Sequence, residues 1–178
     1  YAMRYFADLS FRRDGSSRFR DPWGNFWSIG ASWIISEENF MKSLNWINNL
    51  KLRASYGEVG NDQSAAYYVY QALYLADTNA HQGAYIKSQL ANPELKWEKS
   101  SSIDIALEGR LFDRLNFSID YFDKRSKDLL FDVYNPLSAG PTDLWGTTTV
   151  DPTGRSIITK NIGTVSNKGV DLALDADI

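Results

Sequence analysis

The 178-residue chain contains no cysteine and only one histidine, His81. The lack of cysteine excludes disulfide frameworks, thiolate metal sites and cysteine nucleophiles from this sequence. His81 lies in a loop-like stretch without a partner set, so a catalytic triad and a histidine-based zinc site lack their parts. Acidic pairs such as Glu37 with Glu38 show no sign of the two separated carboxylates that a glycosidase needs. We therefore expect neither an enzyme nor a bound metal or cofactor.

Long apolar runs are also missing. No stretch of about 18 apolar residues occurs, which excludes a membrane-spanning helix but not a membrane-spanning strand. The formal net charge of -3 argues against a nucleic-acid binder. Aromatic residues, in contrast, make up 14% of the chain, including six Trp and ten Tyr. Such a composition is typical of strands, membrane-interface belts or sugar-binding surfaces.

The clearest pattern lies in residues 95–131, where two segments alternate apolar and polar positions. Period-two alternation indicates β-strands. Because both apolar sets occupy odd positions, facing residues must sum to an even number, which predicts a pairing of Leu111 with Leu115 around a turn at residues 112–114. A slip by one residue would place Asp104, Glu108 and Asp120 on the apolar side. The apolar positions are Ile103, Ile105, Leu107, Leu111, Leu115, Phe117, Ile119 and Tyr121.

Four further strands are predicted at residues 1–13, 25–36, 50–56 and 161–178, giving about six in all. Between residues 37 and 49 apolar residues recur at helical spacing, which predicts a short amphipathic helical turn. Residues 61–93 and 134–160 lack sustained alternation and are too long for ordinary hairpin loops, so we expect them to be functional or folded on themselves. We expect the chain to be an internal piece of a longer protein.

Alternation alone does not decide which face looks inward. In a soluble antiparallel sheet the apolar face is the core, whereas in an outer-membrane barrel it meets lipid and the polar face lines the lumen. Two features favour the barrel: the strands are about twice the ordinary length, and the long connections all fall at one end of the sheet while the other end has compact turns. The alternative is a soluble β-sandwich that binds carbohydrate through its loop aromatics.

Five sequence motifs, in this order, resemble the C-terminal barrel half of SusC/RagA-type TonB-dependent transporters, and together they cover nearly the whole chain. They are DGSSRF at 14–19, LKLRASYGEVGN at 50–61, NPELKWEKSSSIDIAL at 92–107, DYFDKRSKDLL at 120–130 and NIGTVSNKGVDL at 161–172. The resemblance implies that residues 1–178 form part of an antiparallel up-and-down transmembrane β-barrel with long extracellular loops and short periplasmic turns. The plug domain and the TonB-contacting segment would lie outside this sequence.

The resemblance also implies a role and a location. Transporters of this family import glycan or peptide oligomers through the outer membrane of Bacteroidota-like bacteria, depend on the TonB complex, and pair with a SusD-like surface lipoprotein. Within the loops, aromatic side chains are the candidates for substrate contact, because their faces stack on sugar rings. The first candidate is Trp145, followed by Tyr68, Tyr70 and Tyr85; the alternative is that these aromatics only pack the loops or touch the lid protein.

Overall fold

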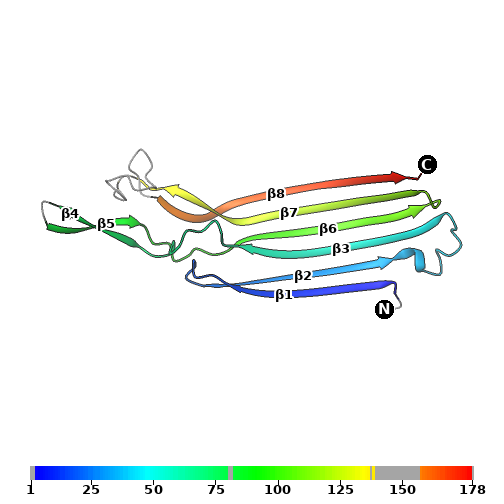
Figure 1. The fold of residues 1–178 in the computed structure, drawn as a ribbon, viewed down its shortest axis with the longest axis horizontal. Helices are drawn as coiled ribbons and strands as arrows, with labels where there is room; N and C mark the ends of the chain where they lie inside the picture. The colour runs from blue at the N-terminus through cyan, green and yellow to red at the C-terminus, as the bar shows by residue number, and fades with distance from the viewer. Residues whose placement is uncertain (1–2, 80–81, 137, 139–156, 178) are drawn as a thin grey trace.

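The structure, a computed structural model, describes residues 3–79, 82–136, 138 and 157–177. Most of the described residues belong to strands (Figure 1). No helix among the described residues is long and apolar enough to cross a membrane. The strands are β1 (Tyr5–Gly15), β2 (Trp23–Ile34), β3 (Ile47–Asn61), β4 (Leu73–Asn79), β5 (Gln82–Gln89), β6 (Glu98–Leu111), β7 (Leu115–Tyr134) and β8 (Ile157–Ala176), and a three-residue 3-10 helix, η1 (Ile35–Glu37), follows β2.

Six of the strands form one antiparallel sheet in the order β1-β2-β3-β6-β7-β8. Each strand lies beside its predecessor in the chain, except that β4 and β5 form a separate hairpin inserted between β3 and β6. This hairpin projects beyond one end of the sheet (Figure 1). The up-and-down topology and the six strands of the large sheet confirm the predicted fold class. Residues 61–93 were expected to be either functional or folded on themselves, and the hairpin shows that they fold on themselves. The sheet is not closed in this chain.

The register follows the parity argument. Leu111 pairs with Leu115, and the same register places Leu107 opposite Ile119 and Ile105 opposite Tyr121. The intervening turn uses positive φ angles of 55° at Phe112 and 57° at Asp113. Arg114 then donates its backbone N–H to the carbonyl of Leu111 at 3.1 Å. The predicted three-residue turn is therefore confirmed, and one register fixes the faces of β6 and β7.

The predicted helical turn over residues 37–49 is wrong. The 3-10 helix η1 is followed by isolated turns, and β3 already begins at Ile47. The apolar residues that suggested a helix face, Phe40 and Leu44, remain exposed. A short helix needs a packed apolar face, and these side chains have none to pack against. Glu38 connects this segment to β1 and β2, because its carboxylate accepts hydrogen bonds from the Tyr5 hydroxyl and from Nε1 of Trp33. These hydrogen bonds lower the pKa of the Glu38 carboxyl.

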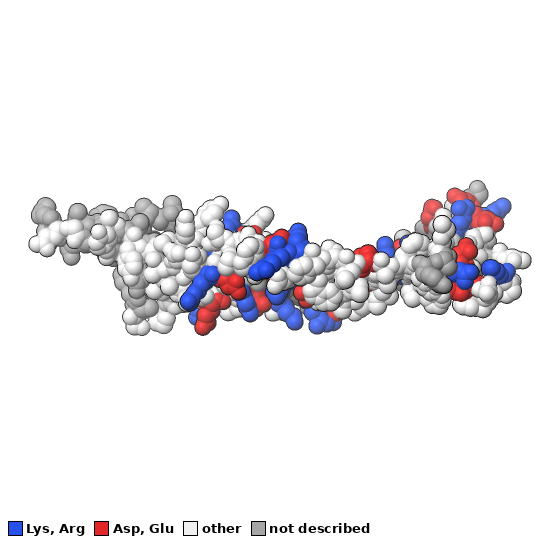
Figure 2. All heavy atoms as spheres, turned by 90° about the horizontal axis from the view of Figure 1, so that it is seen from below, with Lys and Arg blue, Asp and Glu red and all other residues white. Residues whose placement is uncertain are grey.

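Among the described residues, no second layer covers the apolar face of the large sheet. Ile105, near the middle of β6, is 44% exposed, and Leu172 on β8 is 64% exposed. In a sandwich these side chains would lie beneath another sheet. Figure 2 shows charged side chains over the middle of the molecule and at the end opposite the β4-β5 hairpin, on the side in view. The sandwich alternative is therefore not favoured.

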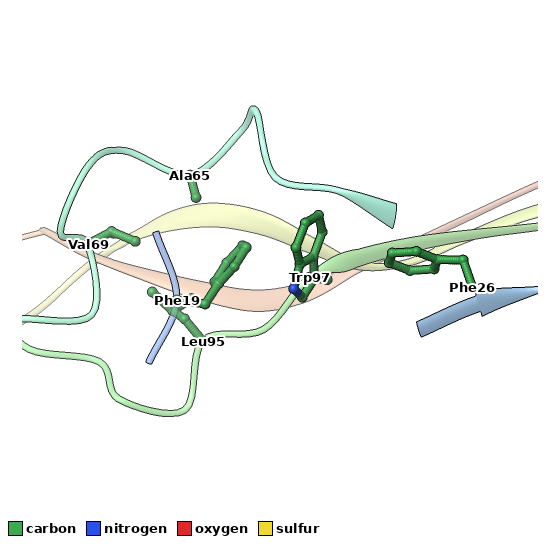
Figure 3. Packing of buried hydrophobic residues seen from close by; sticks show 6 residues of the cluster. All are labelled: Phe19, Phe26, Ala65, Val69, Leu95 and Trp97. Atoms are coloured by element: carbon green, nitrogen blue, oxygen red, sulfur yellow. The ribbon is translucent and has the colours of Figure 1, made fainter. Parts of the chain in front are cut away.

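The buried apolar core lies at one end of the sheet, where the long connections meet. This rim core consists of six side chains from four segments of the chain, with Trp97 between Phe19 and Phe26 (Figure 3). The ring centroids of Trp97 and Phe19 are 5.5 Å apart, and those of Trp97 and Phe26 are 5.7 Å apart. Such aromatic pairs add stability beyond the buried area alone. The members are Phe19, Phe26, Ala65, Val69, Leu95 and Trp97.

A buried carboxylate joins the rim core to the sheet. Glu98, only 6% exposed, accepts hydrogen bonds from Asn61 Nδ2 and Ser64 Oγ at 2.8 Å each. Its second oxygen accepts the backbone N–H of Leu130, also at 2.8 Å. Leu130 follows a bulge in β7 at which Asp128 has a φ of 57°. One side chain thus ties β6 to the loop after β3 and to the irregular part of β7.

We predict that Gly60→Ala destabilises the rim core whereas Gly57→Ala does not. A Cβ on Gly60 would lie 2.0 Å from Cζ of the buried Phe26, but a Cβ on Gly57 would lie 3.4 Å from Cβ of Ser28, an ordinary contact. We expect Gly60→Ala to lower the free energy of unfolding by about 1–3 kcal/mol. Thermal unfolding of the full-length protein in detergent measures this. Equal midpoints for the two variants would contradict the packing described for Phe26.

We further predict that Glu98→Gln loosens the base of the long loop. An amide supplies one acceptor oxygen where the carboxylate supplies two, so a donor would be left unsatisfied at a cost of about 1–3 kcal/mol. Hydrogen exchange of the backbone at residues 61–66 and at Leu130 should accelerate roughly tenfold or more. The control is Glu94→Gln, at an exposed carboxylate just before the same strand. Unchanged exchange rates in Glu98→Gln would show that the carboxylate does not hold the loop after β3 and the bulge of β7 to β6.

Candidate functional site

The polar face of the sheet is hollowed by a groove of about 500 Å³. It crosses β1, β2, β3 and β6, and Lys124 of β7 closes one side. The side chains that the alternation assigns to this face are charged or carry hydroxyl groups. They are Asp8, Ser28, Ser32, Lys51, Arg53, Ser55, Ser102, Asp104 and Lys124. A surface of this kind can hydrogen-bond a polar oligomer through many weak contacts rather than through one deep pocket.

Arg53 is the electrostatic centre of this face. Its Nη2 atom lies 3.2 Å from Oε1 of Glu108 and 3.2 Å from Oδ1 of Asp120, so one guanidinium links β3 to both β6 and β7. All three side chains are part-exposed, and a pair in water contributes little stability. These ion pairs therefore contribute mainly by holding the three charged side chains in fixed places on the polar face.

The charge on the polar face changes sign across the sheet. Lys51 and Arg53 make β3 basic, whereas in β6, β7 and β8 most charged side chains on this face are acidic, with Arg110 and Lys124 among the exceptions. Asp120 of β7 lies directly opposite Asp171 of β8, an arrangement of like charges that is unfavourable unless cations or water screen it. A ligand crossing this face would therefore meet a basic strand beside a mainly acidic region. The acidic positions are Asp104, Glu108, Asp120, Asp171 and Asp175.

Three of the four predicted aromatic residues, Tyr68, Tyr70 and Tyr85, are among the described residues, and the structure does not bring these three together into one site. Tyr68 is exposed, with a φ of 57°, in the turn that precedes β4. Tyr70 is half-buried, and its hydroxyl accepts a hydrogen bond from Nε2 of Gln71 at 2.8 Å. Tyr85 is 79% exposed on β5 of the separate hairpin. Trp145 lies outside the described residues.

Two aromatic features were not predicted from the sequence. Tyr74 of β4 lies diagonally across the hairpin from Tyr85: Tyr74 pairs with Lys87, two residues beyond Tyr85, so both tyrosines occupy one face. Tyr74 is 58% exposed, and the two rings thus form an open aromatic face on the hairpin. Near the rim core, the guanidinium of Arg18 lies 4.8 Å from the ring centroid of Tyr67. The sequence did not indicate the Tyr74 and Tyr85 face, because the alternation within one strand does not reveal which residues of β4 and β5 lie opposite each other.

Groups for metal chemistry are not assembled in the part of the chain that is described. No cluster of three or more His, Cys, Asp or Glu side chains there could hold a metal ion. His81 lies outside the described residues. The described residues thus form a polar face with regions of opposite charge, and exposed tyrosines lie at the long-loop end, an arrangement suited to reversible binding of an extended ligand.

Comparison with known proteins identifies the family. The family model described as TonB dependent receptor-like, beta-barrel, matches residues 2–177. TonB-dependent receptor P39 of Formosa agariphila is 40% identical over 99% of the chain, and TonB-dependent receptor SusC of Bacteroides thetaiotaomicron is 31% identical over 97%. A solved structure of the RagAB peptide importer in the 'closed-closed' state matches 98% of the chain with a TM-score of 0.77 and 30% identity.

These relatives are much longer than the chain. It spans 16% of receptor P39, 17% of SusC and 18% of the matched RagAB chain. The match nevertheless covers almost every residue of this sequence, including all six strands of the large sheet. The sequence resemblance to SusC/RagA-type transporters is thereby confirmed: the chain belongs to the family of TonB-dependent receptor-like β-barrels.

Proposed function

We propose that the complete protein is an active importer of glycan or peptide oligomers in the outer membrane of a Bacteroidota-like bacterium. Residues 1–178 would supply part of the barrel wall and its extracellular loops. The plug domain and the segment that contacts the TonB complex would lie elsewhere in the protein, and a SusD-like surface lipoprotein would cover the loop end. The role is transport, in which the chain's own residues bind and guide the ligand without catalysis.

One observation supports this proposal most directly: the sheet exposes opposite chemistries on its two faces, and within the part of the chain that the structure describes no second layer covers either face. Between Ile103 and Leu111 the outward positions of β6 are apolar apart from Gly109, over a length of nine residues. A tilted strand needs about 9–11 residues to cross the hydrocarbon layer. The opposite face carries the groove and the charges around Arg53. Lipid on one side and a watery lumen on the other would satisfy both faces.

The composition of the polar wall supports a polar oligomer as the cargo. Serine hydroxyls, carboxylates and cations can hydrogen-bond sugar hydroxyls or peptide groups in turn, so that no single contact traps the ligand. First contact would occur outside, on the exposed tyrosines Tyr68 and Tyr85 together with Tyr70 and Trp145. Tyr74 adds a second ring beside Tyr85. The relative SusC is named as a TonB-dependent receptor, which supports energy coupling, and RagAB is named as a peptide importer, which supports peptides as one of the two cargo classes.

The importer assignment predicts loss of uptake on deletion of the gene. We expect the deletion strain to stop accumulating one class within a panel of fluorescent oligosaccharides and oligopeptides, and we expect a protonophore to stop the same uptake in the wild type. A plasmid copy should restore it. Wild-type accumulation of every panel member by the deletion strain would contradict the proposal.

The hairpin tyrosines provide a test within this chain. Each aromatic stacking contact contributes about 0.5–1.5 kcal/mol. In the Tyr74→Ala/Tyr85→Ala double variant we therefore expect the half-saturating concentration for uptake to rise roughly tenfold, with the maximal rate retained. Phe40→Ala, at an exposed aromatic residue near the short turns, is the matched control. If the double variant transports like the control at equal surface abundance, these tyrosines do not contact the cargo.

A further inference from the structure

Basic side chains gather on the outward face of β6, β7 and β8, just beyond the apolar band. Continuing the alternation from Ile103 toward the long-loop end brings Ser101 and Lys99 to the same face, and on β7 it brings Asp123, Arg125 and Lys127. On β8 the pairing places Lys168 beside Asp123. We call the four cations the basic margin: Lys99, Arg125, Lys127 and Lys168.

Two lysines of the basic margin repel each other. Lys99 and Lys127 are directly opposite in the β6-β7 pairing. Within the described residues neither side chain forms an ion pair with a carboxylate, and both are exposed. Like charges directly opposite destabilise a sheet. An anion bound between the two ammonium groups would remove this repulsion.

The other two cations share one buried carboxylate. Arg125 binds Asp123 through two hydrogen bonds, of 3.1 Å from Nε and 2.7 Å from Nη2, and Nζ of Lys168 lies 3.1 Å from the same carboxylate. Asp123 is 6% exposed, whereas the two cations remain about half exposed. The carboxylate therefore positions the cations, and the basic margin with Asp123 retains a net charge of +3. Glu58, opposite Ser101, instead accepts a hydrogen bond from the Tyr56 hydroxyl.

Hydroxyl groups alternate with these cations. Ser101 lies opposite Arg125, and Ser166 lies on the other side of it; Thr164 lies opposite Lys127. Ser166 and Thr164 are exposed. Below them on the same face, Ile103 and Val170 are exposed apolar side chains. The surface thus offers, in sequence along the strands, contacts for acyl chains, for phosphate and for sugar hydroxyls.

We propose that the basic margin binds the phosphorylated sugar headgroup of a glycolipid in the outer leaflet of the membrane, with the acyl chains against the apolar band below it. The inference rests on the proposed outer-membrane location. Charge complementarity selects a phosphate-bearing partner, since basic clusters next to a hydrophobic segment attract anionic headgroups. The flanking hydroxyls favour a phosphorylated sugar over a phospholipid. The lysine stems can extend along the apolar surface while their ammonium groups reach the phosphates.

The test measures lipid binding to the full-length protein in detergent, with lipid A as the probe. We expect lipid A to bind and dephosphorylated lipid A to bind at least tenfold more weakly. In Lys99→Gln/Lys127→Gln, affinity for lipid A should fall roughly thirtyfold, since each basic residue near an anionic surface contributes about 1 kcal/mol. The control is Lys42→Gln/Arg114→Gln, which removes two exposed cations at the short-turn end and should bind lipid A as the wild type does.

Three results would overturn the proposal: equal binding of lipid A by the Lys99→Gln/Lys127→Gln protein and the wild type, equal binding of dephosphorylated lipid A, or binding of phosphatidylglycerol as tight as that of lipid A. Heat-dependent mobility on gels shows in parallel whether each variant forms a closed barrel. Because binding is measured without transport, failure here leaves the uptake experiments unaffected, and a failed uptake experiment with intact lipid binding would count against the importer assignment alone.

Discussion

The two-residue repeat of the β-strand, kept in one register across six strands, is the constraint on which the rest of the structure depends. Leu107 lies opposite Ile119, and Ile119 lies opposite Leu172, so apolar side chains continue from strand to strand. The same register carries Arg53 to Ala106 and on to Asp120 on the other face. A slip at any one pairing would put carboxylates among the apolar rows. The two faces, and thus the two environments, are set together.

The loop end adds a second level of organisation that strand pairing alone does not supply. Trp97 and its neighbours pack loops that start from different strands, and Glu98 ties that packing to the sheet. Rigid bases of this kind let the outer parts of long loops vary while their starting points stay fixed. The tyrosine face of the β4-β5 hairpin stands on such a base. The loops and the sheet beneath them are thereby joined through a few buried side chains.

Sequence patterns predicted the six strands of the large sheet and the β6-β7 turn, because alternation and parity are local properties of the chain. They did not predict the β4-β5 hairpin, which lies in a stretch expected only to be functional or folded on itself. They did not predict the rim core: Phe19, Ala65 and Leu95 follow no period, and only the folded loops bring them together. The helical spacing at Phe40 and Leu44 was misleading, since no surface receives those side chains. The pair formed by Tyr74 and Tyr85, and the charge contacts of Arg53, required a knowledge of which residues lie opposite one another.

The central claim is that the odd positions of β6 face lipid and the even positions face the lumen. Spin labels attached to single cysteines at positions 103 to 108 of the full-length protein, reconstituted in bilayers, test it most directly. The chain itself has no cysteine to replace. We predict high accessibility to oxygen at 103, 105 and 107 and high accessibility to a water-soluble nickel chelate at 104 and 108. High oxygen accessibility at 104 and 108 with high nickel accessibility at 103, 105 and 107, or nickel accessibility at every position, would contradict the claim.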